Sequence, residues 1–120
     1  MLGRMTRTPS LPRPMPRKEQ PDVLPLEGEI DLHVSPEVAE SLRTITVKKP
    51  KRVVVDLTKV TYLDSSGLAT LIEGMQNVQE YGGQFAVAGM QESVKHIFDI
   101  ARLDQVFQIF ATVDEALAAT

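Results

Sequence analysis

Two apolar segments with different periods flank a short polar stretch in the middle of the chain. Residues 52–57 form a β-branched run, which is typical of a buried strand. After the polar stretch at residues 64–67, apolar residues recur with helical spacing, and this stripe consists of Leu68, Leu71, Ile72, Met75 and Val78. The pattern predicts a strand, a turn and a helix, with the hydroxyls of Ser65 and Ser66 at the helix start. Ligands and switches often occupy that position in α/β folds.

Strand and helix patterns alternate along the rest of the chain. Strands are predicted over residues 23–31, 84–89 and 106–110, with Pro25 favouring an edge or entry position in the first of them. Helices are predicted from Ser35, over residues 93–101 and over residues 113–119. Such alternation favours a largely parallel sheet of four to five strands with right-handed crossovers and about four helices. The expected fold class is therefore α/β.

Helix boundaries carry recognisable signals. Ser35 is a candidate capping hydroxyl, followed by proline and glutamate, and the apolar face of its helix comprises Val38, Leu42 and Ile45. Gly82 and Gly83 supply a stop for the central helix. Thr112 and Glu115 form a capping box for the last one. These signals make the predicted element order self-consistent.

Composition narrows the class of protein. The 120 residues suit one domain, and 42% hydrophobic and 24% charged residues are ordinary for a soluble globular chain. There is no cysteine, which excludes disulfides, thiol catalysis and zinc–thiolate sites. No apolar run approaches the length of a membrane span, and no continuous apolar core follows the basic N-terminus. A cytoplasmic protein without membrane insertion is expected.

Charge and proline are distributed unevenly. Residues 1–25 carry five basic and two acidic side chains and six of the eight prolines. We therefore interpret residues 1–22 as a basic, proline-rich, disordered arm, and residues 23–120 as the folded domain. Residues 26–120 carry eight basic and fourteen acidic side chains, which disfavours direct binding of nucleic acid by the domain. We expect this arm to be a disordered leader or a misassigned start, and contact of its basic residues with anionic lipid or nucleic acid is the alternative.

The candidate chemistry favours binding over catalysis. No phosphate-binding glycine loop and no Gly-x-Ser-x-Gly elbow is present, and a nucleophilic Ser65 or Ser66 would need a positioned base. Asp31 and His33 lie two positions apart, on one side of an extended chain, where they could bind a metal as a pair. A loop-capping role for Asp31 and a surface position for His33 are favoured instead. His96 lies in a predicted helix with no histidine four residues away. No enzyme activity, cofactor or metal is expected. Local chemistry alone favours a helix cap for Asp64, with Leu63 packing against Leu68.

Several segments resemble one known family. The stretch Thr-Tyr-Leu-Asp-Ser-Ser-Gly-Leu at residues 61–68 is similar to the phosphorylation motif of STAS domains of the anti-sigma-factor antagonist type. Residues 26–31 resemble that family's Gly-Glu-Leu-Asp strand end, and residues 53–57 its following strand. Residues 93–98, Leu103 and residues 114–117 resemble its C-terminal half. The resemblance covers residues 23–119 and implies a STAS-like fold.

The resemblance also implies a mechanism. Antagonists of this family bind an anti-sigma factor that is also a serine kinase, and so release a sigma factor. The kinase phosphorylates the antagonist on the serine after the aspartate, and a phosphatase restores it. Carried over, Ser65 is the phosphorylation site. The partner-binding surface comprises Asp31, Asp64, Ser65, Ser66, Gly67 and Leu68.

One departure and one alternative accompany this prediction. The family usually has a further strand before the Gly-Glu-Leu-Asp strand, but residues 1–21 contain five prolines, which suit a central strand poorly. A short, displaced or missing first strand would leave an exposed edge that pairs with a second copy, so a monomer or weak homodimer is expected. The alternative function is a STAS-domain regulatory subunit of an ABC-type lipid transporter.

Overall fold

The computed structural model describes residues 21–119, which form an α/β fold around one parallel sheet. The strands, in sheet order, are β2 (Pro21–Ile30), β3 (Arg52–Leu63), β4 (Gln84–Ala88) and β5 (Gln108–Phe110). The helices are α1 (Ser35–Thr46), α2 (Ser65–Glu80), α3 (Glu92–Ile100) and α4 (Val113–Ala118), with a 3-10 turn, η3 (Leu103–Gln105). All three strand pairings are parallel. The predicted fold class is confirmed.

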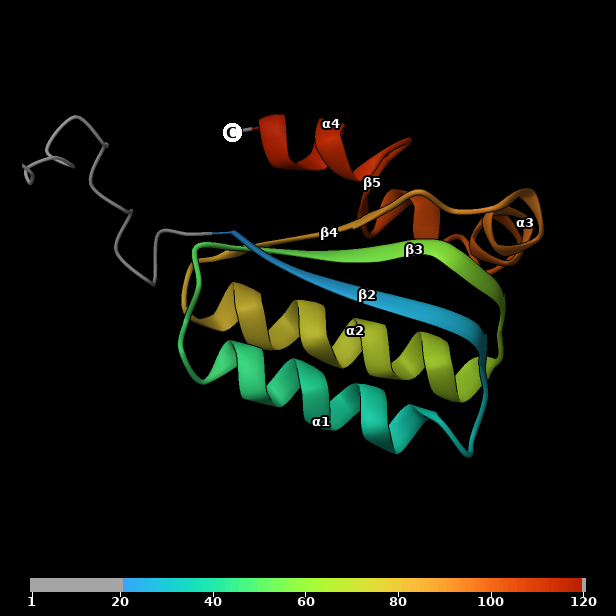
Figure 1. The fold of residues 1–120 in the computed structure, drawn as a ribbon, viewed down its shortest axis with the longest axis horizontal. Helices are drawn as coiled ribbons and strands as arrows, with labels where there is room; N and C mark the ends of the chain where they lie inside the picture. The colour runs from blue at the N-terminus through green and yellow to red at the C-terminus, as the bar shows by residue number, and fades with distance from the viewer. Residues whose placement is uncertain (1–20, 120) are drawn as a thin grey trace, which may run out of the picture.

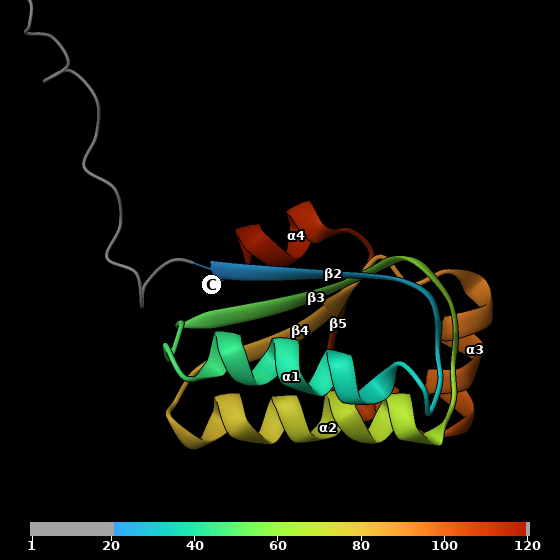
Figure 2. The same ribbon diagram turned by 60° about the horizontal axis from the view of Figure 1, so that its bottom comes forward.

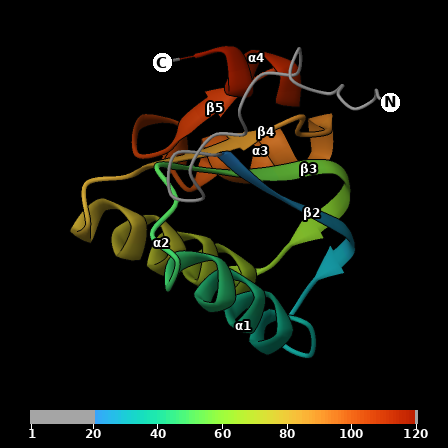
Figure 3. The ribbon, with the colours of Figure 1, turned by 60° about the vertical axis from the view of Figure 1, so that its left-hand side comes forward.

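The helices cover the two faces of the sheet unequally. Helices α1 and α2 lie side by side under one face, and both begin at the end where β2 and β3 finish (Figures 1 and 2). Helix α4 lies on the opposite face, as Figure 3 shows with the left-hand side of Figure 1 turned forward. The main core therefore lies between the sheet and helices α1 and α2, and side chains of α3 also contribute to it. Its fully buried members include Val53, Val55, Leu57, Leu71, Val78, Val87 and Phe98.

The predicted stripe of α2 is the face that packs on the sheet. Leu71, Met75 and Val78 are buried, and Leu68 and Ile72 pack at the margin of the same cluster. Burying side chains of this size contributes roughly 1.5–3 kcal/mol each. The small cluster under α4 contains Val54, Ala88 and Ala116. The α2 side of the sheet therefore holds most of the core.

Strand β3 is longer than its sequence pattern indicates. The β-branched run ends at Leu57, but the strand continues to Leu63 because its second half pairs with β2, from Glu27 beside Lys59 to Ile30 beside Leu63. Two register shifts, after Pro25 and after Gly28, accommodate this extension. The strand predicted over residues 23–31 begins earlier, at Pro21, and ends at Ile30. Asp31 therefore belongs to the loop before α1.

Smaller corrections concern the C-terminal half. The strand predicted over residues 106–110 starts at Gln108, because the N–H groups of Val106 and Phe107 both donate to the carbonyl of Leu103 and close a turn. Phe107 is buried there against Phe85 and Phe98. Helix α3 starts and ends one residue before its predicted bounds.

Helix caps test the local predictions directly. Asp64 caps α2 and Thr112 caps α4, as expected, and Gly82 adopts a left-handed φ of 87° after α2. The predicted cap at Ser35 is wrong. The N-cap of α1 is Val34, which makes no side-chain capping bond, and the hydroxyl of Ser35 points elsewhere.

Residues 1–20 and 120 lie outside the described part, so the predicted disordered arm and the question of a first strand are not tested there. The last two residues of the predicted arm, Pro21 and Asp22, belong to β2. Within residues 21–119, β2 pairs with β3 alone and is an edge strand. Pairing of this edge with a second copy stays a prediction. None of the helices in the described part is long and apolar enough to cross a bilayer.

Candidate functional site

The predicted site residues gather where β2 and β3 end and where α1 and α2 begin. The N–H of Asp64 donates to the carbonyl of Ile30 at 3.2 Å, which joins the two strand ends. Gly67 is buried at this junction. A Cβ added there would lie 2.7 Å from the Ile30 oxygen and 2.9 Å from a methyl of Leu63. Glycine at position 67 therefore allows the first turn of α2 to pack directly on the end of β2.

Asp64 organises the first turn of α2. Its Oδ1 accepts the N–H of Ser66 at 2.9 Å, the N–H of Gly67 at 3.0 Å and the hydroxyl of Ser66 at 2.6 Å. These bonds stabilise the carboxylate, with the Ser66 hydroxyl as the largest cause and the Gly67 N–H next, so the pKa of Asp64 lies below its ordinary value. Partial desolvation opposes the shift without reversing it. Asp64 is therefore ionised at neutral pH.

Asp31 has a separate role in the neighbouring loop. Its Oδ1 accepts the N–H groups of His33 at 3.0 Å and Val34 at 3.2 Å, which shapes the turn into α1. The interpretation of Asp31 as a loop-capping aspartate and of His33 as a surface residue is confirmed. Within residues 21–119, no three His, Cys, Asp or Glu side chains gather closely enough to hold a metal ion.

The hydroxyl of Ser66 is tied to both helices. Besides Asp64, it contacts the hydroxyl of Ser35 at 2.9 Å, and Ser35 in turn donates to the carbonyl of Asp31 at 2.8 Å. Ser35 is 5% exposed, so this pair links the starts of α1 and α2 inside the protein. Sequence reasoning missed this role of Ser35, since the residue pattern shows a cap and no contact over 31 positions.

Ser65 differs from Ser66 in every one of these respects. Ser65 is exposed, and the hydrogen bonds of the described residues include none to its hydroxyl, whereas Ser66 is half-buried. Among the other predicted partner-binding residues, Asp31, Asp64 and Leu68 are half-buried and Gly67 is buried. Among the described residues, the hydroxyl of Ser65 is therefore exposed and without a hydrogen bond, and the residues beneath it are held together by hydrogen bonds.

Two exposed apolar side chains at the same end of the molecule were not predicted. Leu32 follows Asp31 in the loop and is 70% exposed, and Tyr62 precedes the motif on β3 and is 46% exposed. The backbone N–H of Leu32 also helps to lower the pKa of Asp64, so this loop lies against the cap of α2. The sequence signal for this surface was Leu32, an apolar residue between the polar residues Asp31 and His33. Exposed apolar groups near the ends of β2 and β3 suit a protein-binding surface.

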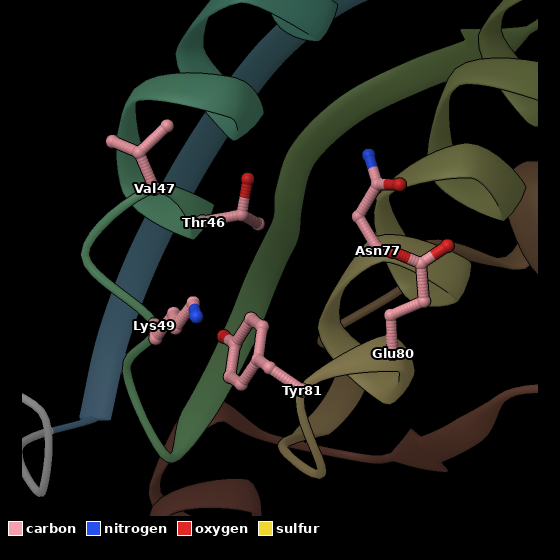
Figure 4. A pocket seen from close by; sticks show the side chains of 6 residues that line it. All are labelled: Thr46, Val47, Lys49, Asn77, Glu80 and Tyr81. Atoms are coloured by element: carbon pink, nitrogen blue, oxygen red, sulfur yellow. The ribbon is translucent and has the colours of Figure 1, made fainter.

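A cleft lies at the opposite end of α1 and α2. Its volume is about 310 Å³, and it is lined by Thr46, Val47, Lys49, Asn77, Glu80 and Tyr81 (Figure 4). Ser65 and Glu80 are the two ends of the 16-residue helix α2, which is about 24 Å long. None of the predicted site residues lines this cleft, so it is separate from the Ser65 site.

Comparison with known proteins identifies the family. The sequence model of the STAS domain matches residues 14–116, and the chain belongs to this family. It is 29% identical to the "Anti-sigma-B factor antagonist" of Listeria monocytogenes over 68% of this chain and 72% of that protein. It is 28% identical to the "Anti-sigma-F factor antagonist RsfB" of Mycobacterium tuberculosis over 79% and 77%, respectively. The predicted resemblance to STAS antagonists is confirmed.

Solved structures with the same fold include an anti-sigma factor antagonist and a sulfate transporter family protein. The crystal structure of an anti-sigma factor antagonist from Mycobacterium paratuberculosis superposes with a TM-score of 0.73 at 27% identity, covering 79% of this chain and 80% of that one. A sulfate transporter family protein from Wolinella succinogenes also superposes with a TM-score of 0.73, at 18% identity and 82% coverage of each chain. The fold alone therefore does not distinguish a sigma regulator from a transporter domain.

Proposed function

We propose that this protein is an anti-sigma-factor antagonist that works as a phosphorylation-controlled partner switch, with Ser65 as the phosphate acceptor. The names of the curated relatives support the general function. The observation that carries the residue assignment is a contrast between two hydroxyls. The Ser65 hydroxyl is exposed and makes no hydrogen bond to residues 21–119, whereas the Ser66 hydroxyl donates to Asp64 and contacts Ser35. A kinase needs an accessible hydroxyl that reaches the phosphorus in line.

The proposed partners are an anti-sigma factor with serine kinase activity, and a phosphatase that reverses the modification. The protein itself acts as ligand and substrate in the cytoplasm, and catalysis belongs to the partners. Asp31, Asp64, Gly67 and Leu68 support this surface from below, while Ser65 lies on it. Exposed Leu32 and Tyr62 extend the surface with apolar area that a partner would cover.

A phosphate on Ser65 would change the surface without unfolding the domain. It adds about −1.5 to −2 charges at the first residue of α2, where the helix dipole tolerates an anion. Asp64 beside it is already ionised and its Oδ1 is committed to the cap. Both negative groups would have to be desolvated together when a partner docks, which weakens binding. The proposed switch is therefore a loss of affinity by repulsion at the interface.

Mapping the modification tests the residue assignment. The full chain is incubated with its anti-sigma serine kinase and ATP, and the site is mapped by mass spectrometry. Phosphate is expected on Ser65, and Ser65→Ala should abolish it. Ser93→Ala is the matched control, because Ser93 is also exposed near the start of a helix, α3. Modification of the parent chain only at Ser66 or elsewhere would refute the assignment.

Binding measurements test the switch itself. Ser65→Ala should bind the kinase as the parent does, and Ser65→Asp should bind about tenfold more weakly, or about 1.4 kcal/mol. Thr112→Asp adds the same charge at the start of α4 and should leave affinity unchanged. Calorimetry with the kinase, beside thermal melts of each variant, measures both quantities. Equal affinity of Ser65→Asp, phosphorylated chain and parent would contradict the switch, and a regulatory subunit of a lipid transporter would then be the better candidate.

A further inference from the structure

Three short oxygen–oxygen contacts at the site share two hydroxyl protons. Ser66 Oγ lies 2.6 Å from Asp64 Oδ1, Ser35 Oγ lies 2.8 Å from the carbonyl of Asp31, and the two hydroxyls lie 2.9 Å apart. The charged acceptor Asp64 takes the proton of Ser66, because hydrogen bonds to carboxylates are stronger than those to neutral oxygens. Ser35 then supplies its proton to Ser66 or to Asp31. When Ser35 donates to Ser66, Ser66 Oγ has two hydrogen bonds. When Ser35 donates to Asp31, no proton lies between the two hydroxyl oxygens, and Ser66 Oγ keeps its bond to Asp64 with Ser35 Oγ packed against it at 2.9 Å.

Phosphoryl transfer requires that the oxygen of the acceptor serine is accessible and that its proton can leave. The acceptor oxygen forms a bond to the γ-phosphorus of ATP while the bond from that phosphorus to the β,γ-bridging oxygen breaks and ADP leaves. The hydroxyl proton passes to a base of the kinase. Ser66 would first have to give up its bond to Asp64 and its contact with Ser35. Its new phosphate would then sit beside an ionised carboxylate and a serine that is only 5% exposed.

We propose that Ser35 is a positioning residue that determines which serine of the motif is phosphorylated, by holding the Ser66 hydroxyl inside the protein and leaving Ser65 as the acceptor. This inference rests on the proposed function and extends it to a residue on another helix. The determinant is tertiary, because Ser35 begins α1 and lies 31 positions from Ser66.

Ser35→Ala in the full chain is the direct test. Losing one contact of ordinary hydrogen-bond strength should raise the ratio of Ser66 to Ser65 phosphorylation about fivefold, measured by quantitative mass spectrometry with the same serine kinase and ATP. Ser35→Thr keeps a hydroxyl and should restore the parent ratio. Ser41→Ala removes a half-buried serine from the same helix, outside the hydroxyl pair, and should change nothing. Thermal melts confirm that each variant is folded.

A second measurement needs no kinase. NMR couplings between Hα and Hβ should show one staggered side-chain rotamer for Ser66 and averaging for Ser65 in the parent chain. In Ser35→Ala the Ser66 couplings should shift towards averaging. Averaged Ser66 couplings in the parent, or an unchanged phosphorylation ratio in folded Ser35→Ala, would overturn the role of Ser35 and leave the proposed function standing. A parent chain that accepts no phosphate on Ser65 would instead overturn the proposed function, and the role of Ser35 in it.

Discussion

The starts of α2 and α4 use similar local chemistry in different surroundings. Asp64 caps α2 through the N–H groups of Ser66 and Gly67, and Thr112 caps α4 through the N–H of Glu115 at 3.1 Å. At α4 the cap stands alone at the surface. At α2 a buried glycine, a strand end and a serine from α1 enclose it. A helix cap becomes a candidate site when tertiary contacts fix one hydroxyl and leave its neighbour free.

The largest difference between the two helix starts should appear at the third helical position. Gly67→Ala places a methyl group against the Ile30 carbonyl, so the free energy of unfolding should fall by about 1–3 kcal/mol. Glu115→Ala is the equivalent change at α4, where the residue is exposed, and should stay within about 0.5 kcal/mol. Urea unfolding of both variants measures this. If both variants lost the same free energy of unfolding, the close packing around the start of α2 would not contribute to stability.

The second difference concerns binding by exposed apolar groups. Leu32→Ala and Tyr62→Ala should each weaken kinase binding about tenfold without lowering the melting temperature, because both side chains are exposed beside the α2 start. Ile100→Ala is the matched control, since Ile100 is as exposed as Leu32, at 70%, but lies at the end of α3. Affinity is measured by calorimetry. A comparable loss for Ile100→Ala would place the docking surface elsewhere.

The third difference separates stability from binding at α4. Thr112→Ala removes the capping bond to Glu115 and should cost about 1 kcal/mol of stability. Affinity for the kinase should not change, because this helix lies on the opposite face of the sheet from α1 and α2 (Figure 3). Denaturant unfolding and calorimetry on the same sample give both values. Weaker binding by the folded variant would mean that α4 is part of the interface.

The smallest effect is a dependence on pH that only the α2 cap should show. The pKa of Asp64 is lowered in the folded protein, chiefly by the Ser66 hydroxyl, so its contribution to stability is present above the unfolded pKa of about 4. It is lost as the pH falls through the lower folded pKa. The stability gap between the parent and Asp64→Asn should therefore narrow on acidification, whereas the Thr112→Ala gap should stay constant. Melts across this range measure both gaps.

Local patterns predicted most of the fold, and non-local contacts account for what they missed. The helical stripe of α2 and the caps at Asp64 and Thr112 depend on residues within a few positions, so the sequence sufficed. The continuation of β3 to Leu63 depends on pairing with β2, which its own composition does not reveal.

The candidate site shows the same division. The motif located Ser65 and Ser66 at a helix start, but it could not distinguish their hydroxyls. That distinction depends on Ser35, whose sequence context resembles an ordinary cap. Likewise, the need for glycine at position 67 of α2 arises from the carbonyl of Ile30, at the end of β2.

The parallel pairing of β2 with β3 has a consequence for the order of events in folding. Parallel neighbours cannot be joined by a tight hairpin, so α1 must cross over before the two strands meet. The entropy of closing that loop is lost before any contact across it forms, which makes such pairings slow. The Ser35–Ser66 contact spans the same crossover, so it requires the same loop closure as the strand pairing. During synthesis, the hydroxyls of Ser65 and Ser66 therefore acquire different surroundings only after the start of α2 has left the ribosome and reached α1.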